Sequence, residues 1–240
     1  MQEKNYVKNS LEIIKLENKK MYLESLQQER TMNYEIAIGK FQKGYVTKIE
    51  LDEIELQQKE VQRQIENVNA QIRSKEEISQ MYGTVSDMPE ILQNLPNLVG
   101  NFEEDYVTNN LQIEEYDYKI SEYEKSISNA AANEDTENLR VQKELLEIER
   151  QNYINTIHAF VKEQLVNYHV LCSGMEQTDD ELEILQEKIS IYTKLLNAGE
   201  VPQYSLANLT TRKSELEYHR METLCDGIYI KYVLEHRIYE

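Results

Sequence analysis

The chain has 240 residues and a net charge of −18, and this balance disfavours nucleic acid as a partner because phosphate binding needs a basic surface. With seven Gly, three Pro, no Trp and 29% charged residues, the composition is not that of an ordinary globular domain. Such a composition with helical periodicity is typical of long helices or a coiled coil.

The first predicted element is a helical hairpin over residues 1–81. A helical pattern runs over residues 4–43 and stops at Gly44, and glycine readily adopts the left-handed conformation that commonly ends a helix. Thr47 and Glu50 then have the spacing of a capping box, in which the Thr side chain accepts a backbone N–H and the Glu reaches back to the cap. The hairpin tip is therefore placed at residues 44–47.

The return helix of this hairpin covers residues 47–81. Its apolar positions are spaced four, three and four residues apart, which is the pattern of a coiled-coil seam: Val61, Ile65, Val68 and Ile72. Because the turn is so short, the two helices are predicted to be antiparallel neighbours.

Residues 82–104 interrupt the helical pattern and are predicted to form an irregular belt or linker segment. The punctuating residues are Gly83, Pro89, Pro96 and Gly100. A short helix capped by Asp87 is expected inside the belt, and three leucines are expected to anchor it: Leu92, Leu95 and Leu98.

Residues 105–240 are predicted to form a second hairpin region. One helix is expected over residues 104–128, and a helix on the order of 90 Å long is expected over 136–198. A second tip follows at residues 199–202, where Pro202 suits the first position of the last helix.

The two tips share a pattern that indicates a duplicated hairpin. Counted from Gly44 and Gly199, both copies have Val two residues on, which are Val46 and Val201. Both copies also have Leu seven residues on, and Ile or Leu ten residues on. A repeated tip of this kind implies two copies of one helical unit.

A helix that ends in Gly-x-Val, followed by a Thr or Pro start and then Leu, resembles the hairpin tips of the TolC-like outer-membrane efflux protein family. Residues 76–98 also resemble the helix end and irregular belt that follow the family's first hairpin, and the similarity runs over roughly residues 5–238. The resemblance implies an all-α fold of two long antiparallel coiled-coil hairpins, the protomer of a TolC-like α-barrel, with a short irregular belt.

The family's membrane strands lie between the helices placed here at 104–128 and 136–198. In this chain the connection is about eight polar residues, so no β-barrel is expected, since a membrane strand needs about 9–11 residues. Neither a signal peptide nor a transmembrane segment is recognised, although family members are exported. The chain is then either a fragment or truncated gene or a divergent relative, and the first of these is favoured.

The resemblance also implies a function. Family members are homotrimers of the cell envelope, in the outer membrane and periplasm, and they serve as passive conduits of multipartite efflux or type I secretion systems. Their tips dock onto a periplasmic adaptor protein attached to an inner-membrane pump. Carried over, the adaptor-binding positions are those of the two tips: Gly44, Tyr45, Val46, Thr47, Gly199, Glu200, Val201 and Pro202.

Glu50 has two interpretations. It is the capping-box partner of Thr47, and it also stands where the family has an acid in the ring that constricts the channel mouth. At the second tip the corresponding family acids fall on Ser205 and Asn208, so most of the charged closing network is missing.

No catalytic, metal or cofactor site is predicted, because the four His are scattered and no nucleophile is paired with a base. The chain is therefore not expected to be an enzyme. Cys172 and Cys225 are expected on antiparallel neighbours; their spacing allows a disulfide, but two buried or half-buried thiols are favoured. The alternative function is a soluble coiled-coil scaffold for protein–protein contacts.

Overall fold

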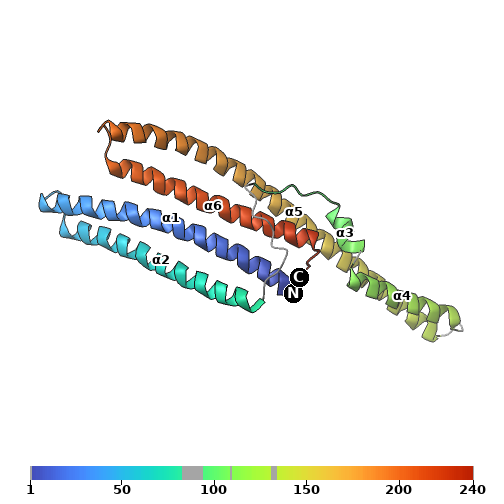
Figure 1. Ribbon diagram of the computed structural model, residues 1–240. Helices are drawn as coiled ribbons and strands as arrows, with labels where there is room; N and C mark the ends of the chain where they lie inside the picture. The colour runs from blue at the N-terminus through green and yellow to red at the C-terminus, as the bar shows by residue number, and fades with distance from the viewer. Residues whose placement is uncertain (1, 83–93, 109, 131–133, 240) are drawn as a thin grey trace. The chain divides into compact units, whose positions relative to one another are not determined.

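The computed structural model describes residues 2–82, 94–108, 110–130 and 134–239, and it confirms the all-α fold. These ranges hold α1 (Gln2–Gln42), α2 (Lys48–Tyr82), α3 (Phe102–Thr108), α4 (Leu111–Asn129), α5 (Glu134–Asn197) and α6 (Gln203–Glu235) (Figure 1). They contain no strand, and none of their helices has a stretch long and apolar enough to cross a bilayer.

The chain divides into two compact units. Unit 1 combines Met1–Leu95 with Leu171–Tyr229, and unit 2 combines Pro96–Val170 with Ile230–Glu240. Unit 1 therefore holds α1, α2, the C-terminal part of α5 and most of α6. Unit 2 holds α3, α4, the N-terminal part of α5 and the end of the chain.

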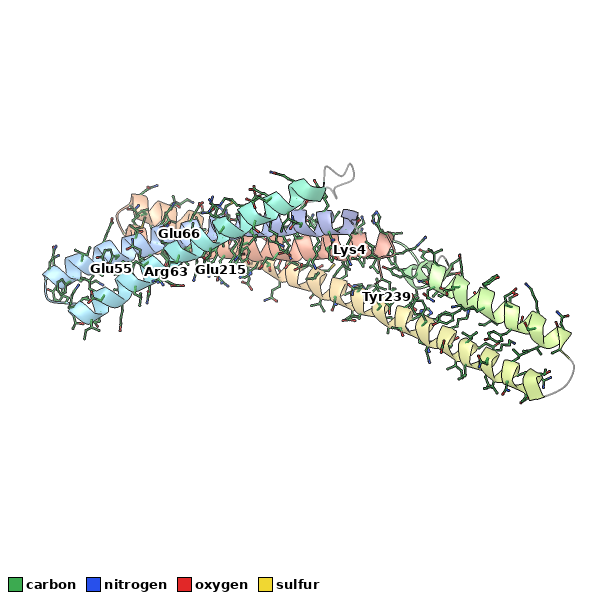
Figure 2. The ribbon with its side chains drawn as sticks, turned by 90° about the horizontal axis from the view of Figure 1, so that it is seen from below. Lys4, Glu55, Arg63, Glu66, Glu215 and Tyr239 are labelled. Atoms are coloured by element: carbon green, nitrogen blue, oxygen red, sulfur yellow. The ribbon has the colours of Figure 1, made fainter. Side chains whose placement is uncertain are left out.

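Unit 1 is a layer of four long helices in the order α5, α6, α1, α2 (Figure 1). The α1–α2 hairpin has the predicted apolar seam at its centre, where Leu23 of α1 packs among Val61, Ile65, Val68 and Ile72 of α2. Glu55, Arg63 and Glu66 are among the charged side chains of the same helix (Figure 2). A buried apolar stripe of this kind packs an amphipathic helix against its neighbour.

The second hairpin of unit 1 packs against α1 through α6. The Lys15 ammonium lies 2.6 Å from the Asp226 carboxylate, and the rings of Tyr22 and Tyr218 stack with centroids 6.1 Å apart. From the first of these contacts to the second, the residue number in α1 rises and that in α6 falls, so the two helices are antiparallel. On its other side α6 contacts α5 through Arg220, whose Nε lies 2.5 Å from Asp179.

Unit 2 is built around a third hairpin, formed by α4 and the N-terminal part of α5. Arg150 of α5 donates two hydrogen bonds to Asp117 of α4, at 2.6 and 3.2 Å, and Lys143 lies 2.9 Å from Glu124. From the first pair to the second, the residue number rises in α4 and falls in α5, so these two helices are also antiparallel. The single helix predicted over residues 104–128 is therefore two helices, the second of them half of a hairpin.

Asn110 marks the start of α4. Its side-chain oxygen accepts hydrogen bonds from the backbone N–H groups of Gln112 and Ile113, at 3.0 and 3.2 Å, which makes it the N-cap of α4.

The predicted belt ends earlier than expected, because α3 begins at Phe102. Belt anchors Leu95 and Leu98 are half-buried, whereas the cap at Asp87 and the anchor Leu92 lie outside the described residues.

The end of the chain is held in unit 2 by Tyr106 of α3. The Tyr106 hydroxyl is buried and donates to the carbonyl oxygens of Val233, at 2.7 Å, and Ile238, at 3.3 Å. The ring of Tyr239 packs edge-on against Phe160, with centroids 5.2 Å apart. These contacts tie α3, α5 and the C-terminal residues into one small core.

Replacing Tyr106 by Phe is expected to lower the free energy of unfolding by about 1–2 kcal/mol, because two carbonyls lose their donor in a buried site. Burial also raises the pKa of Tyr106. The stability from this group is therefore complete below about pH 10, where the unfolded tyrosine ionises, and declines as the pH rises further. Urea denaturation at pH 7 and pH 11 measures both effects. The exposed Tyr118 provides the matched Tyr→Phe control, which should leave both values unchanged.

Candidate docking tips and open helix edges

The two hairpin tips of unit 1 have the same backbone. At the first tip, Gly44 has φ of +77°, its N–H donates to the Phe41 carbonyl at 2.9 Å, and the N–H of Tyr45 donates to the Lys40 carbonyl at 2.9 Å. At the second tip, Gly199 has φ of +75° and the two donations recur with the same lengths, to Leu196 and Leu195. Both are helix ends of the Schellman type, in which a left-handed glycine lets the chain turn back on the last carbonyls.

Equivalent positions in the two hairpins are 155 residues apart, as Gly44 and Gly199 are. Helices α1 and α5 end at equivalent residues, and α2 and α6 begin at equivalent residues. Pro202 thus lies one residue before the helix, at the place of Thr47, and not inside it as predicted. Proline is tolerated there because the residue that precedes a helix has no intrahelical donor to lose.

The capping box at the first tip is confirmed. Glu50 Oε2 accepts hydrogen bonds from the Thr47 backbone N–H at 2.7 Å and from the Thr47 hydroxyl at 2.8 Å. The Glu50 N–H in turn donates to Thr47 Oγ1 at 3.2 Å. The capping interpretation of Glu50 is therefore satisfied by geometry, and its role at a channel mouth stays a prediction.

Replacing Thr47 by Ala is expected to raise the pKa of Glu50. The Thr47 backbone N–H and hydroxyl hold that pKa below its usual range, so the loss of the hydroxyl, and of the turn geometry it supports, should move the value back towards that of a free Glu. Carboxyl titration by NMR of the variant and of the unaltered protein measures the change. An unchanged Glu50 pKa in the variant would show that the capping box does not form in solution.

The side chains at the tips differ from expectation in one respect. A place at the end of a long hairpin predicts an exposed side chain for Val46 and Val201, yet both are half-buried. The first tip presents Tyr45 instead, which is 78% exposed. The equivalent residue at the second tip is Glu200, also exposed, so the two tips share a backbone but not a surface.

The two outer helices of the unit 1 layer, α2 and α5, expose apolar side chains at positions whose equivalents in the inner helices, α6 and α1, are buried. Leu56 of α2 is 59% exposed, and the equivalent residue of α6, Thr211, is 7% exposed. Ile184 of α5 is 55% exposed, and the equivalent residue of α1, Glu29, is 5% exposed. The internal α6–α1 junction thus buries polar groups at positions where the two open edges of the layer present aliphatic ones.

Sequence reasoning identified part of this surface. The helical spacing places Ile184, Ile191 and Leu195 beside the main seam and predicts that they need a partner. Ile184 and Ile191 are exposed, and Leu195 is half-buried beside the second tip. Leu56 was missed. It is the residue of α2 that is equivalent to Thr211 of α6, 155 residues later, so the repeat indicates that this face of α2 should also meet another hairpin.

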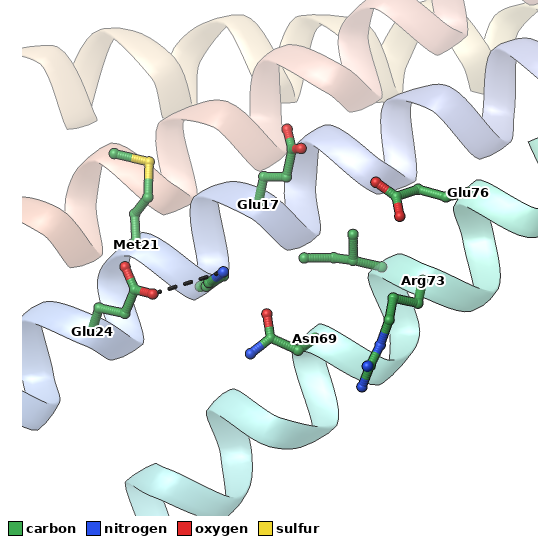
Figure 3. Close-up of a pocket in the computed structure, with 8 residues that line it drawn as sticks. Glu17, Met21, Glu24, Asn69, Arg73 and Glu76 are labelled. Atoms are coloured by element: carbon green, nitrogen blue, oxygen red, sulfur yellow. Dashed lines mark ion pairs between the residues drawn. The ribbon is translucent and has the colours of Figure 1, made fainter.

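A groove of about 710 Å³ runs between α1 and α2 (Figure 3). It is lined by Glu17, Lys20, Met21 and Glu24 of α1 and by Asn69, Ile72, Arg73 and Glu76 of α2. Its carboxylates are offset by Lys20, which lies 3.9 Å from Glu24, and by Arg73, and the set holds no nucleophile beside a base. Across the described residues, no group of three or more His, Cys, Asp or Glu could hold a metal ion.

Both cysteines of unit 1 are free thiols. Cys225 is fully buried and Cys172 is half-buried. Burial raises the pKa of the Cys225 thiol to about 11, so this thiol is protonated and unreactive at neutral pH. Of the two alternatives that the sequence allowed, a disulfide and two free thiols, the structure therefore shows the free thiols.

Long antiparallel hairpins with paired tips at one end of a helical layer define a distant TolC-like fold. The chain superposes with a TM-score of 0.76 on a solved structure of CusC, whose published description concerns conformational changes that accompany folding and transmembrane channel formation. The match covers 98% of this chain and 74% of CusC, at 10% sequence identity. No protein-family model matches the sequence, and no curated protein matches it.

Proposed function

We propose that this protein is the conduit component of a TolC-type export system. Copies of the chain, three by the family resemblance, close into a hollow barrel in the cell envelope, in the outer membrane and periplasm. The hairpin tips dock onto a periplasmic adaptor protein that links the barrel to an inner-membrane pump of an efflux or type I secretion system. The barrel itself catalyses no reaction, and the pump supplies the energy.

The observation that carries this proposal is the pair of open edges of unit 1. Within one chain, the returning helix of the second hairpin, α6, packs against the entering helix of the first, α1. The free edges are again a returning helix, α2, and an entering helix, α5. The repeat therefore predicts how two copies of the chain meet. Helix α2 of one copy packs against α5 of the next in the same way as α6 packs against α1 within one chain.

A contact of this kind is heterologous, because it joins two different surfaces. Heterologous contacts produce a closed ring when the rotation between copies divides a full turn, and an open filament when it does not. Leu56 and Ile184 fit such a contact, since exposed aliphatic side chains gain free energy when a neighbour removes them from water. The likeness to CusC supports the fold of the protomer that would form this ring.

Disulfide cross-linking tests the proposed junction directly. The hydroxyl of Ser25 lies 3.5 Å from the Thr211 hydroxyl at the internal junction, and the equivalent residues are Asp180 and Leu56. In a C172A/C225A background, the pair L56C/D180C is expected to cross-link between chains under mild oxidation. Because α2 and α5 are at opposite edges of the layer, a bond within one chain is excluded.

The control pair M21C/D180C places the first cysteine on the inner helix α1 and should not cross-link. Products of L56C/D180C that grow into a ladder and stop at a closed species support the ring. Absence of cross-links at all chain concentrations would overturn the proposal and favour the alternative, a soluble scaffold that uses its tips and acidic faces for other contacts.

A further inference from the structure

A cavity of about 180 Å³ lies between α1 and α6, the two inner helices of unit 1 (Figure 1). Its lining from α1 includes Ser25, Glu29 and Met32, and its lining from α6 includes Gln203 and Leu206. The volume is that of about six water molecules at about 30 Å³ each, so a small organic molecule fits inside it. The cavity belongs neither to the docking tips nor to the open edges at α2 and α5.

The carboxylate of Glu29 lines this cavity, and the residue is only 5% exposed. No Lys, Arg or His among the described residues lies within 4.0 Å of that carboxylate, and none lines the cavity. The Asn208 amide nitrogen lies 3.5 Å from Glu29 Oε1, which is longer than the usual N–H···O distance of about 2.7–3.2 Å. A buried charge normally has an opposite charge beside it, so Glu29 lacks the charged partner that its burial calls for.

The two arginines that are close to this junction in sequence have other partners. Arg30 follows Glu29 in α1, but its Nη1 donates to the side-chain oxygen of Gln57 in α2, at 3.3 Å. Arg212 of α6 has its Nη1 2.5 Å from the carboxylate of Glu215 on the same helix. The positive charge that would balance Glu29 is therefore not supplied by either arginine.

The hairpin fold does not require a carboxylate at this place. Residue 184 is equivalent to Glu29 through the 155-residue repeat, and it is an isoleucine. The same long helix is thus formed with an aliphatic side chain at this position in one copy of the repeat and with a carboxylate in the other. A ligand in the cavity gives Glu29 a role that helix formation does not.

We propose that the cavity between α1 and α6 binds a small alkylammonium cation, whose ammonium group pairs with Glu29. An ammonium group has three N–H donors, and the side-chain oxygens of Ser25 and Gln203 are further acceptors in the lining. Met32 and Leu206 supply an apolar wall for a short alkyl chain. A calcium ion is a poorer fit, because it takes about six to eight oxygen ligands and a single carboxylate lines this cavity.

The bound cation contacts both hairpins of unit 1, because the cavity is lined by α1 and by α6. A ligand that binds the folded chain and not the unfolded chain raises the melting temperature as its concentration rises. Alkylammonium binding should therefore stabilise the junction between the two hairpins. This inference concerns a single chain and does not depend on the proposed export function or on assembly.

The test is an NMR titration of the full chain with n-butylammonium chloride. The methyl signal of Met32, assigned with the variant M32L, is expected to shift to saturation. The methyl signal of Met21, which is on α1 but does not line the cavity, should not move. Two further titrations separate charge from shape: n-butanol has the alkyl chain without the charge, and sodium chloride has a cation without the alkyl chain. Neither should shift the Met32 signal.

The variant E29Q keeps the shape of the side chain and removes its charge. It is expected to raise the dissociation constant for n-butylammonium by about tenfold or more, and to abolish the rise in melting temperature. The matched control E35Q removes the same charge from an exposed residue of α1 that does not line the cavity. It should bind as the unaltered protein does, and circular dichroism checks that both variants keep their helix content.

Several results would overturn the proposal. A Met32 shift of the same size with n-butanol would make the cavity an apolar site without selectivity for a cation, and one with sodium chloride would make the shift a response to salt. Unchanged affinity in E29Q, or no saturable shift with n-butylammonium, would remove the site. None of these results bears on the ring of unit 1, which the L56C/D180C cross-link tests separately.

Discussion

Aspartate at both open edges of unit 1, in the variant L56D/I184D, is expected to convert the assembled protein into monomers. Each substitution removes an aliphatic side chain from the proposed α2–α5 junction and places an unpaired carboxylate there. Loss of two partly buried aliphatic groups costs about 2–4 kcal/mol per junction, a factor of about 30 to 1,000 in its dissociation constant. Sedimentation over a range of chain concentrations measures the change.

The effect should be confined to assembly. Both side chains are more than half exposed in the single chain, so the helix content measured by circular dichroism should not change. The variant I191D, on the same edge of α5, should weaken assembly in the same direction. The matched control is M21D, which charges a residue on the inner helix α1 that is also more than half exposed. Assembly of L56D/I184D at the concentration of the unaltered protein would remove the basis for the ring.

Loss of export is the result expected for the tip variant V46D/V201D, with assembly intact. Gly44 and Gly199 have no side chain, so in the proposed docking a partner's backbone can approach each tip closely, with the neighbouring valine as a small apolar contact beside it. Each contact is weak, so affinity arises from several tips that engage at once, and a charge at every tip multiplies the loss. Export from the producing cell and cross-linking of the tips to the adaptor are the measurements.

The half-burial of Val46 and Val201 makes the control important, since an aspartate there also perturbs the turn. The variant Q42D/N197D adds the same charge at equivalent, exposed helix ends two residues before each glycine. It should export normally, because it alters neither the turn nor the valine of either tip. The further variant Y45D tests the first tip alone through its most exposed side chain. Normal export by V46D/V201D would mean that the tips are only turns.

Much of unit 1 follows from local signals in the sequence. Gly44, Gly199 and the Thr47–Glu50 pair mark the tips because few residues satisfy those backbone positions, and the structure shows both turns and the cap. The α2 seam follows from spacing alone, since a helix places residues three and four apart on one side. These features depend only on neighbours along the chain.

The rest depends on contacts between segments far apart in the sequence. An amphipathic pattern runs through residues 104–128, so Asn110 was not recognised as a cap, although its side chain begins α4. The helical periodicity of the sequence likewise predicts a second apolar side on α2 and on α5, but it does not identify the helix that packs against that side. Only the α6–α1 junction, read through the 155-residue repeat, shows that Leu56 and Ile184 are at open edges.

The central claim is that copies of this chain enclose a channel. Its most direct test is the mass of the protein in mild detergent, measured together with single-particle images of the same sample. A particle of three times the chain mass of 28.4 kDa, with a hollow centre in end views, is the expected result. A particle of one chain mass at every concentration, or an assembly with a filled centre, would contradict it.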